Sequence, residues 1–175
     1  MLELKLCNET HIEELKRVAV QSYQEHYLYL WAEPHFAQWF MDKSFSEESL
    51  SQQMKEEQVL FYLVVKNGKN AGFIKLNKNK ALPGDDAAKS LELERIYLVK
   101  EVSGKGLGTA VLNKIIEYCR QQGIEVIWLK SMDSSDSVLF YQKRGFVITA
   151  SEQLPYEGFK EEYRTILTMR LEVKK

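Results

Sequence analysis

Residues 103–111 read SGKGLGTAV, and this stretch decides the fold that the sequence predicts. Three of the nine glycines of the chain alternate here, as Gly104, Gly106 and Gly108. Glycine costs conformational entropy and offers no side chain to bury, so such a run favours a turn whose backbone another group approaches closely. Apolar residues then recur at helical spacing over 107–119, which predicts a helix that starts at the turn.

A strand that enters a helix through glycines presents backbone N–H groups at the helix N-terminus, where the helix dipole adds partial positive charge. This arrangement predicts a binding site for phosphate or pyrophosphate. Lys100 and Lys105 are near enough in sequence for their side chains to bring positive charge to it. A tight connection without a ligand is the alternative. The spacing does not match the nucleotide P-loop. The unit also lies mid-chain, without the βαβαβ array that a dinucleotide-binding fold needs.

The segments around the turn alternate between strands and helices. Residues 91–129 form a β-turn-α-β unit, whose two strands we expect to be parallel neighbours. Thr10 and Glu13 have the spacing of a capping box that opens a helix, Pro34 divides the aromatic segment 23–42 into two helices, and Asn67-Gly68 is typical of a hairpin turn. The expected strands are 2–6, 59–65, 71–76, 91–99, 124–129, 146–149 and 163–171, with a helix over 46–55, a loop over 77–90, a helix end at Gly123 and a short helix through Tyr141.

This order predicts an α/β fold of the α+β type, a mixed sheet with flanking helices, in one domain over residues 1–175. The formal net charge of −1 argues against a nucleic-acid partner. Cys7 and Cys119 lack metal-ligand spacing, so we expect neither a metal site nor a disulfide. The first ten residues carry charges where a signal peptide is apolar, and no apolar run approaches the roughly 20 residues of a membrane span. We therefore expect a cytoplasmic protein with no membrane partner.

Two motifs resemble the cofactor-binding core of the GCN5-related N-acetyltransferase (GNAT) superfamily. They are LERIYLVKEVSGKGLGTAVL and, downstream at the expected distance, LFYQKRGF. The superfamily's phosphate signature, Arg/Gln-x-x-Gly-x-Gly/Ala, falls on Gly106 and Gly108 and puts Ser103 where Arg or Gln is usual. The segments HYLYLWAEPHFAQWF and LPYEGFKEEYRTILTMRL resemble the PaiA-like bacterial spermine/spermidine N-acetyltransferases. The resemblance implies acetyl transfer from acetyl-CoA to a primary amine of a small molecule, with polyamines favoured, by direct transfer through a tetrahedral intermediate.

The resemblance also implies which residues bind acetyl-CoA. The glycine turn would hold the pyrophosphate, the strand that precedes it would run beside the pantetheine arm like a paired strand, and a free N–H near Leu98 would be the oxyanion donor. Ser134 stands where many relatives have an asparagine that contacts pantetheine. Lys143, with Arg144 beside it, would reach the adenosine-side phosphates or simply end a solvated helix. The implied set is Ile96, Tyr97, Leu98, Val99, Ser103, Gly104, Lys105, Gly106, Leu107, Gly108, Thr109, Ser134, Tyr141 and Lys143.

The catalytic candidates are one phenol and two carboxylates. By resemblance Tyr141 is the general acid that protonates the departing thiolate, and the alternative is a tyrosine that only packs a helix onto the sheet. Glu92 and Glu94 share one face of their strand by the period-two rule. Either would serve as the base for the amine if burial raised its pKa. They could equally be the solvent face of an edge strand, or partners for lysines.

The acceptor amine is not specified by any motif. The aromatic N-terminal segment with His26, Trp31 and His35 would wall the acceptor site by resemblance, although most aromatic side chains belong to the core. Other acceptors fit the same fold: a protein N-terminus, a lysine or an aminoglycoside. Ser103 and Ser134 depart from the cofactor motifs and keep open a non-catalytic CoA-sensing module. The alternating strand at 163–171 could pair across a homodimer interface.

Overall fold

The computed structural model describes residues 1–102 and 104–174, so the predicted cofactor contact of Ser103 lies outside the described residues. Within them, seven strands form one sheet in the order β1-β2-β3-β4-β5-β7-β6. All neighbours pair antiparallel except β4 and β5, which are parallel as predicted. The strands are β1 (Leu2–Leu6), β2 (Val59–Lys66), β3 (Lys69–Lys78), β4 (Ser90–Leu98), β5 (Val126–Met132), β6 (Val147–Gln153) and β7 (Thr165–Glu172).

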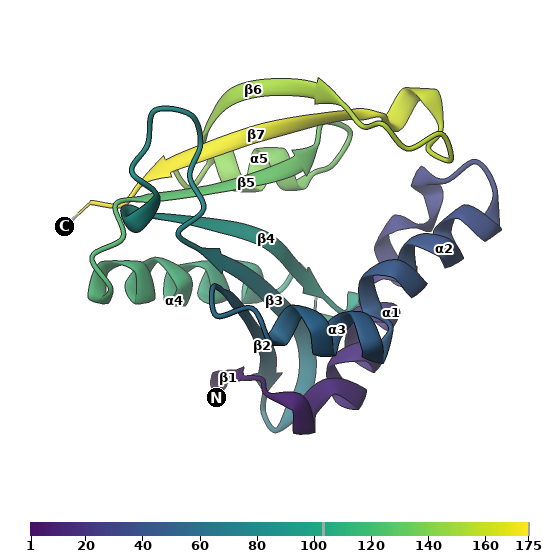
Figure 1. The fold of residues 1–175 in the computed structure, drawn as a ribbon, viewed down its shortest axis with the longest axis horizontal. Helices are drawn as coiled ribbons and strands as arrows, with labels where there is room; N and C mark the ends of the chain where they lie inside the picture. The colour runs from purple at the N-terminus through teal and green to yellow at the C-terminus, as the bar shows by residue number, and fades with distance from the viewer. Residues whose placement is uncertain (103, 175) are drawn as a thin grey trace.

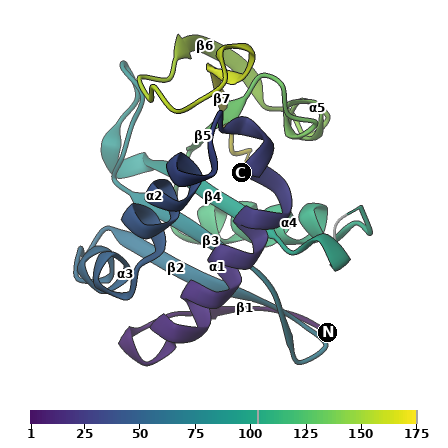
Figure 2. The same cartoon turned by 90° about the vertical axis from the view of Figure 1, so that its right-hand side faces the viewer.

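Helices cover both faces of the sheet. In Figure 2 the helices α1, α2 and α3 lie on the face toward the viewer, and α4 lies behind the sheet. The helices are α1 (Ile12–Tyr27), α2 (Pro34–Phe45), α3 (Glu47–Met54), α4 (Leu107–Gln121) and α5 (Ser137–Gln142). Among the described residues, none of these helices combines the length and the apolar character that crossing a bilayer requires.

Each face of the sheet has its own hydrophobic core. On the α4 face, Val111, Leu112 and Ile115 of α4 pack against strand residues such as Leu91 and Ile127. On the other face, a second cluster joins the first three helices to β2 and β3 and is rich in aromatic rings, including Tyr23, Trp31, Phe45, Phe61 and Phe73. The two cores explain why α4 is amphipathic and why the N-terminal segment needs so many aromatics.

Local signals in the sequence predicted the seven strands, but several boundaries differ: β5 ends at Met132 and β6 at Gln153, beyond the predicted ends at 129 and 149. Pro34 occupies the first turn of α2, where its missing N–H has no helical partner to lose. The Thr10–Glu13 capping box is wrong. Asn8 instead accepts a hydrogen bond from the Thr10 N–H at 3.0 Å and opens a short 3₁₀ helix over Glu9–His11, after which α1 begins without a side-chain cap. The predicted loop over 77–90 is shorter, because β3 continues to Lys78 and β4 begins at Ser90. Gly123, with φ of +69°, follows the C-cap residue Gln122.

A bulge and a divergence in β4 shape the middle of the sheet. β4 pairs with β5 only over Ser90–Glu92, and Figure 1 shows the two strands separating beyond that point. Lys75 pairs with Arg95 and Leu76 with Leu93, so Glu94 is an extra residue, as in a β-bulge. The bulge shifts the alternation of side chains. Residues 92, 95 and 97 therefore face the α1–α2 side, where Tyr97 joins the aromatic core.

Candidate active site

The glycine turn has the backbone that the sequence predicts. Gly104 and Gly106 have φ of +74° and +78°, a conformation that other residues adopt only with strain. A Cβ added at either glycine would meet no heavy atom of the described residues within 4 Å, so the space above the turn is open. Helix α4 begins at Leu107, directly after Gly106. The first hydrogen bond of the helix runs from the Ala110 N–H to the Gly106 carbonyl oxygen, at 3.1 Å. The N–H groups of 107–109 therefore have no acceptor within the helix.

A cavity of about 920 Å³ leads from this turn along the end of β4 to Tyr141. Its lining includes much of the predicted cofactor set: Ile96, Tyr97, Leu98, Gly104, Gly106, Gly108, Thr109, Ser134 and Tyr141. The cavity thus connects the predicted phosphate site to the predicted acid. We call it the long cavity.

Four predicted cofactor residues do not line the long cavity. The Lys105 ammonium donates to the Glu101 carbonyl oxygen at 2.8 Å, Lys143 is exposed outside the cavity, and Leu107 is buried in the core. The Val99 N–H donates to the Ala71 carbonyl at 2.9 Å. The Val99 carbonyl in turn accepts a hydrogen bond from the Val102 N–H at 3.2 Å.

Arg144 lines the long cavity in place of its neighbour Lys143. Its guanidinium lies 3.7 Å from the centroid of the Phe140 ring and donates to the Phe140 carbonyl at 2.8 Å. It also donates to the Thr109 hydroxyl. Arg144 therefore ties α5 to the first turn of α4 and adds positive charge beside the glycine turn.

The end of β4 offers backbone groups to the long cavity. In an antiparallel pair, residues alternate between bonding their partner and pointing away from it. Because Val99 bonds Ala71, the backbone groups of Ile96 and Leu98 point away from β3, toward the side where β5 has diverged. His26 Nε2 lies 3.0 Å from the Leu98 carbonyl oxygen. The direction of the Leu98 N–H fits the predicted oxyanion donor, and that role stays a prediction.

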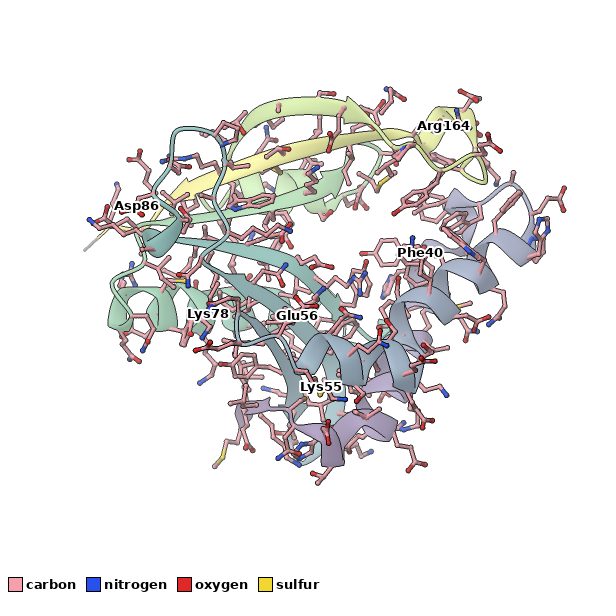
Figure 3. The ribbon with its side chains drawn as sticks, in the orientation of Figure 1. Phe40, Lys55, Glu56, Lys78, Asp86 and Arg164 are labelled. Atoms are coloured by element: carbon pink, nitrogen blue, oxygen red, sulfur yellow. The ribbon has the colours of Figure 1, made fainter. Side chains whose placement is uncertain are left out.

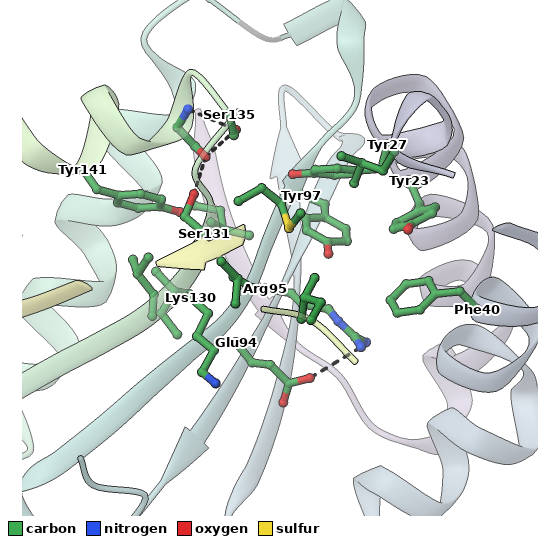
Figure 4. Close-up of a pocket in the computed structure, with 18 of the residues that line it drawn as sticks. Tyr23, Tyr27, Phe40, Glu94, Arg95, Tyr97, Lys130, Ser131, Ser135 and Tyr141 are labelled. Atoms are coloured by element: carbon green, nitrogen blue, oxygen red, sulfur yellow. Dashed lines mark hydrogen bonds and ion pairs between the residues drawn. The ribbon is translucent and has the colours of Figure 1, made fainter. Parts of the chain in front are cut away.

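A second cavity of about 270 Å³ meets the long cavity at Tyr141. We call it the inner cavity. Figure 4 shows Tyr141 on one side and Tyr27 and Tyr97 on the other, and all three line both cavities. Tyr141 is only 6% exposed, with its ring between Phe140 and Phe146. Tyr141 therefore packs against neighbouring rings, as the packing alternative expects, and it also lies where the two cavities meet.

Burial sets the protonation of this phenol. It raises the pKa of Tyr141 well above the usual value, and the nearby phenol of Tyr97 adds to the rise. The hydroxyl is therefore protonated at neutral pH and available as a donor, although it is a weaker acid than an exposed tyrosine.

Three serines that no motif indicated also stand at the junction. The hydroxyl of Ser137 lies 2.8 Å from that of Ser131 and 2.6 Å from that of Ser135. Figure 4 draws this chain of hydroxyls beside Tyr141. Ser131 lines the inner cavity, and the other two line both cavities. Hydroxyls both donate and accept, so the chain can pass a proton between the two cavities.

The two candidate carboxylates share one face and line the inner cavity, as predicted. The Asn77 side-chain amide donates to Glu92 at 2.5 Å and to Glu94 at 2.7 Å. Lys80 pairs with Glu92 at 2.5 Å, and Lys75 pairs with Glu94 at 2.6 Å. β4 is an interior strand, so the edge-strand alternative is wrong and the lysine-partner alternative is confirmed.

The condition for Glu94 to act as the base, a pKa raised by burial, is not met. Burial opposes its ionisation, but the charges of Arg95 and Lys75 outweigh burial and lower its pKa. A carboxylate held in its ionised form this way is a weak proton acceptor.

The N-terminal aromatic segment walls the inner cavity through residues other than those predicted. Tyr23, Tyr27, Leu30 and Phe40 line it, and Figure 3 shows Phe40 projecting from α2. His26 lines the long cavity instead. Trp31 lies behind the wall, where its indole N–H donates to the Tyr23 hydroxyl at 2.8 Å. His35 is exposed against Phe36.

Comparison with known proteins identifies the family. The model described as "Acetyltransferase (GNAT) family" matches residues 17–146. The structure superposes on the PaiA N-acetyltransferase of Thermoplasma acidophilum, solved in complex with coenzyme A, with a TM-score of 0.75. That match covers 98% of this chain and 99% of the other at 20% identity, so it demonstrates a shared fold.

Two curated relatives match over shorter stretches. An uncharacterized N-acetyltransferase from the pepI 3′ region of Lactobacillus delbrueckii subsp. lactis is 30% identical over 107 residues, which is 61% of this chain and 62% of that protein. Streptothricin acetyltransferase A of Bacillus subtilis is 34% identical over 68 residues, 38% of this chain and 39% of that protein. The chain therefore spans less than two thirds of the length of each of these relatives.

Proposed function

The chain belongs to the GNAT family of acetyltransferases, and on this premise we propose that it transfers the acetyl group of acetyl-CoA to a primary amine of a small molecule. The observation that carries the proposal is the meeting of two cavities at Tyr141. One cavity begins at a helix N-terminus suited to a diphosphate. The other is small, lined in part by aromatic rings and suited to an acceptor.

The long cavity fits coenzyme A in its chemistry. The open space above Gly104 and Gly106 leaves room for a diphosphate beside the N–H groups of the first turn of α4. Arg144 adds a positive charge there. The outward-pointing backbone groups of Ile96 and Leu98 would pair with the amides of the pantetheine arm as a neighbouring strand would. Ser134, which lines the same cavity, offers a hydroxyl.

The proposed chemistry is direct transfer. The amine nitrogen attacks the thioester carbonyl, the carbon–sulfur bond breaks, and the electron pair leaves on sulfur. Tyr141 gives its phenolic proton to the thiolate and regains one from solvent. The nitrogen must lose two protons: one before the attack, since a free amine of this class is protonated at neutral pH, and one from the tetrahedral intermediate as the amide forms. Because Glu92 and Glu94 are both ion-paired, we propose that water takes up both protons, with the serine hydroxyls passing them on to solvent.

Polyamines remain the acceptor that the sequence favours. The likeness to PaiA and the presence of Glu92 and Glu94 in the inner cavity support this assignment. Against it, each of these carboxylates already has a lysine partner. A polyamine would have to displace the partners, and Lys80, half exposed at 51%, is the one free to leave. The one-domain organisation, a cytoplasmic location and a homodimer likewise stay predictions.

A thiol-release assay tests the proposed function. The purified protein is incubated with acetyl-CoA and a panel of amines that includes spermidine, amino acids, a lysine peptide and an aminoglycoside. Release of CoA thiol, with a product heavier than the amine by one acetyl group, is the expected result. Acetyl-CoA binding by calorimetry without thiol release for any amine would support the CoA-sensing alternative instead.

A further inference from the structure

The charges around the inner cavity do not balance. Its charged lining residues are Glu92, Glu94, Arg95 and Lys130. Glu92 pairs with Lys80, Glu94 with Lys75, and Lys130 with Glu152. Arg95 shares Glu94 with Lys75, so among these side chains the cations outnumber the carboxylates by one.

Arg95 has few polar partners for a buried cation, namely the Tyr97 hydroxyl and Glu94. Its side chain is 13% exposed, and its nearest carboxylate contact is Nη2 to Glu94 Oε1 at 3.5 Å. The other oxygen of Glu94 lies much closer to Lys75, at 2.6 Å. The buried Nη1 atom has no hydrogen-bond partner among residues 1–102 and 104–174. A buried charge with unsatisfied donors is costly unless an anion completes it.

The fold holds this guanidinium in place. The bulge at Glu94 turns Arg95 toward the α1–α2 side of the sheet. There the guanidinium carbon lies 5.1 Å from the centroid of Phe45 and 6.0 Å from that of Phe40. The two rings limit the motion of the guanidinium, which lies in the wall of the inner cavity and is joined to Glu94 in Figure 4.

We propose that the acceptor carries a carboxylate as well as its amine, and that Arg95 binds this carboxylate. This inference rests on the proposed function and names the class of its substrate: small amino acids with an apolar side chain. The guanidinium edge matches a carboxylate in shape and charge. The apolar part of the wall, which includes Leu30, Phe40, Tyr156 and Phe159, suits an apolar side chain. A polyamine would bring further positive charge beside a cation that shares its one carboxylate with Lys75.

The test compares two acceptors that differ only in the carboxylate. Leucine and 3-methylbutylamine are assayed by thiol release with the wild type and with Arg95→Gln. Because the carboxylate also changes the basicity of the amine, the informative quantity is the change caused by the substitution for each acceptor. We expect kcat/KM for leucine to fall on the order of 10- to 100-fold, the value of a charged hydrogen bond. With 3-methylbutylamine the change should stay within about twofold. Arg120→Gln, which removes a cation on the far end of α4, is the matched control and should change neither acceptor.

A binding measurement separates this inference from the proposed function. Calorimetry with the wild type should show that 4-methylpentanoate binds on the order of tenfold more tightly than 4-methylpentanamide, and that Arg95→Gln removes the difference. If these results hold but no amine releases thiol, the carboxylate site stands and the proposed function fails. If thiol is released with spermidine preferred and Arg95→Gln is without effect, the proposed function stands and this inference is overturned. Equal binding of acid and amide would also overturn it.

Discussion

Replacing Gly108 by alanine separates stability from cofactor binding. Gly108 lies in the first turn of α4 and, unlike Gly104 and Gly106, does not have a positive φ. A Cβ there would meet Phe140 Cζ at 3.4 Å and Leu98 Cδ1 at 3.8 Å, which is ordinary van der Waals contact. Alanine in a helix is favoured over glycine by about 0.5–1 kcal/mol. For a chain of this size the melting temperature should rise by about 1–4 °C.

The same methyl group should weaken the binding of CoA. Gly108 lines the long cavity beside the helix N-terminus, so under the proposed function the added carbon would hinder the approach of a phosphate to this backbone. Losing one hydrogen bond to a charged group corresponds to roughly 10- to 100-fold in affinity. Calorimetric titration with CoA measures the affinity, and a thermal melt without ligand measures the stability.

Gly68→Ala is the matched control for this substitution. Gly68 has φ of +76° in the β2–β3 hairpin turn, remote from both cavities. Its replacement should lower the melting temperature, because the positive φ is strained for alanine, and leave CoA binding unchanged. If Gly108→Ala bound CoA as tightly as the wild type while melting higher, the diphosphate would not lie against this backbone.

Gly72→Ala should destabilise the fold by about 1–3 kcal/mol, because a Cβ there would lie 2.2 Å from the Tyr97 carbonyl oxygen. Chemical denaturation measures the loss in the free energy of unfolding. An unchanged denaturant midpoint would contradict the close approach of β3 and β4. Glu94→Gln should cost about 1–3 kcal/mol at pH 7, since it leaves Lys75 and Arg95 without their carboxylate. The folded pKa of Glu94 is lowered, so its contribution is full above the unfolded value near 4.3 and is lost as the pH falls through the folded pKa. The difference in melting temperature between wild type and variant should therefore shrink on acidification below about pH 4, and a constant difference would refute the ion pairing.

Local signals made the cofactor side predictable. The three glycines, the helical spacing after them and the hairpin at Asn67-Gly68 each specify backbone conformation within a few residues. The parallel β4–β5 pair then follows from the helical crossover that connects the two strands. The long cavity joins these pieces, and its lining therefore agrees with most of the residues predicted from the motifs.

The acceptor side depended on features that no local pattern contains. Strict alternation puts Arg95 on the opposite face from Glu94, but the bulge brings both into the inner cavity. The pairing of Glu94 with Lys75 requires the register of β3 against β4. The serine chain depends on how β5 meets α5. These contacts arise between segments distant in sequence. The sequence therefore indicated Glu92 and Glu94 as candidates but did not predict that lysine partners neutralise their charge.

The role of Tyr141 carries the account, and the turnover number of Tyr141→Phe tests it most directly. Phenylalanine keeps the ring packed between Phe140 and Phe146 and removes only the hydroxyl at the junction of the two cavities. With saturating acetyl-CoA and amine, kcat for thiol release should fall on the order of 100-fold or more, while the calorimetric Kd for CoA stays within about twofold. A variant that turns over at the wild-type rate would contradict the assignment of Tyr141 as the proton donor to sulfur.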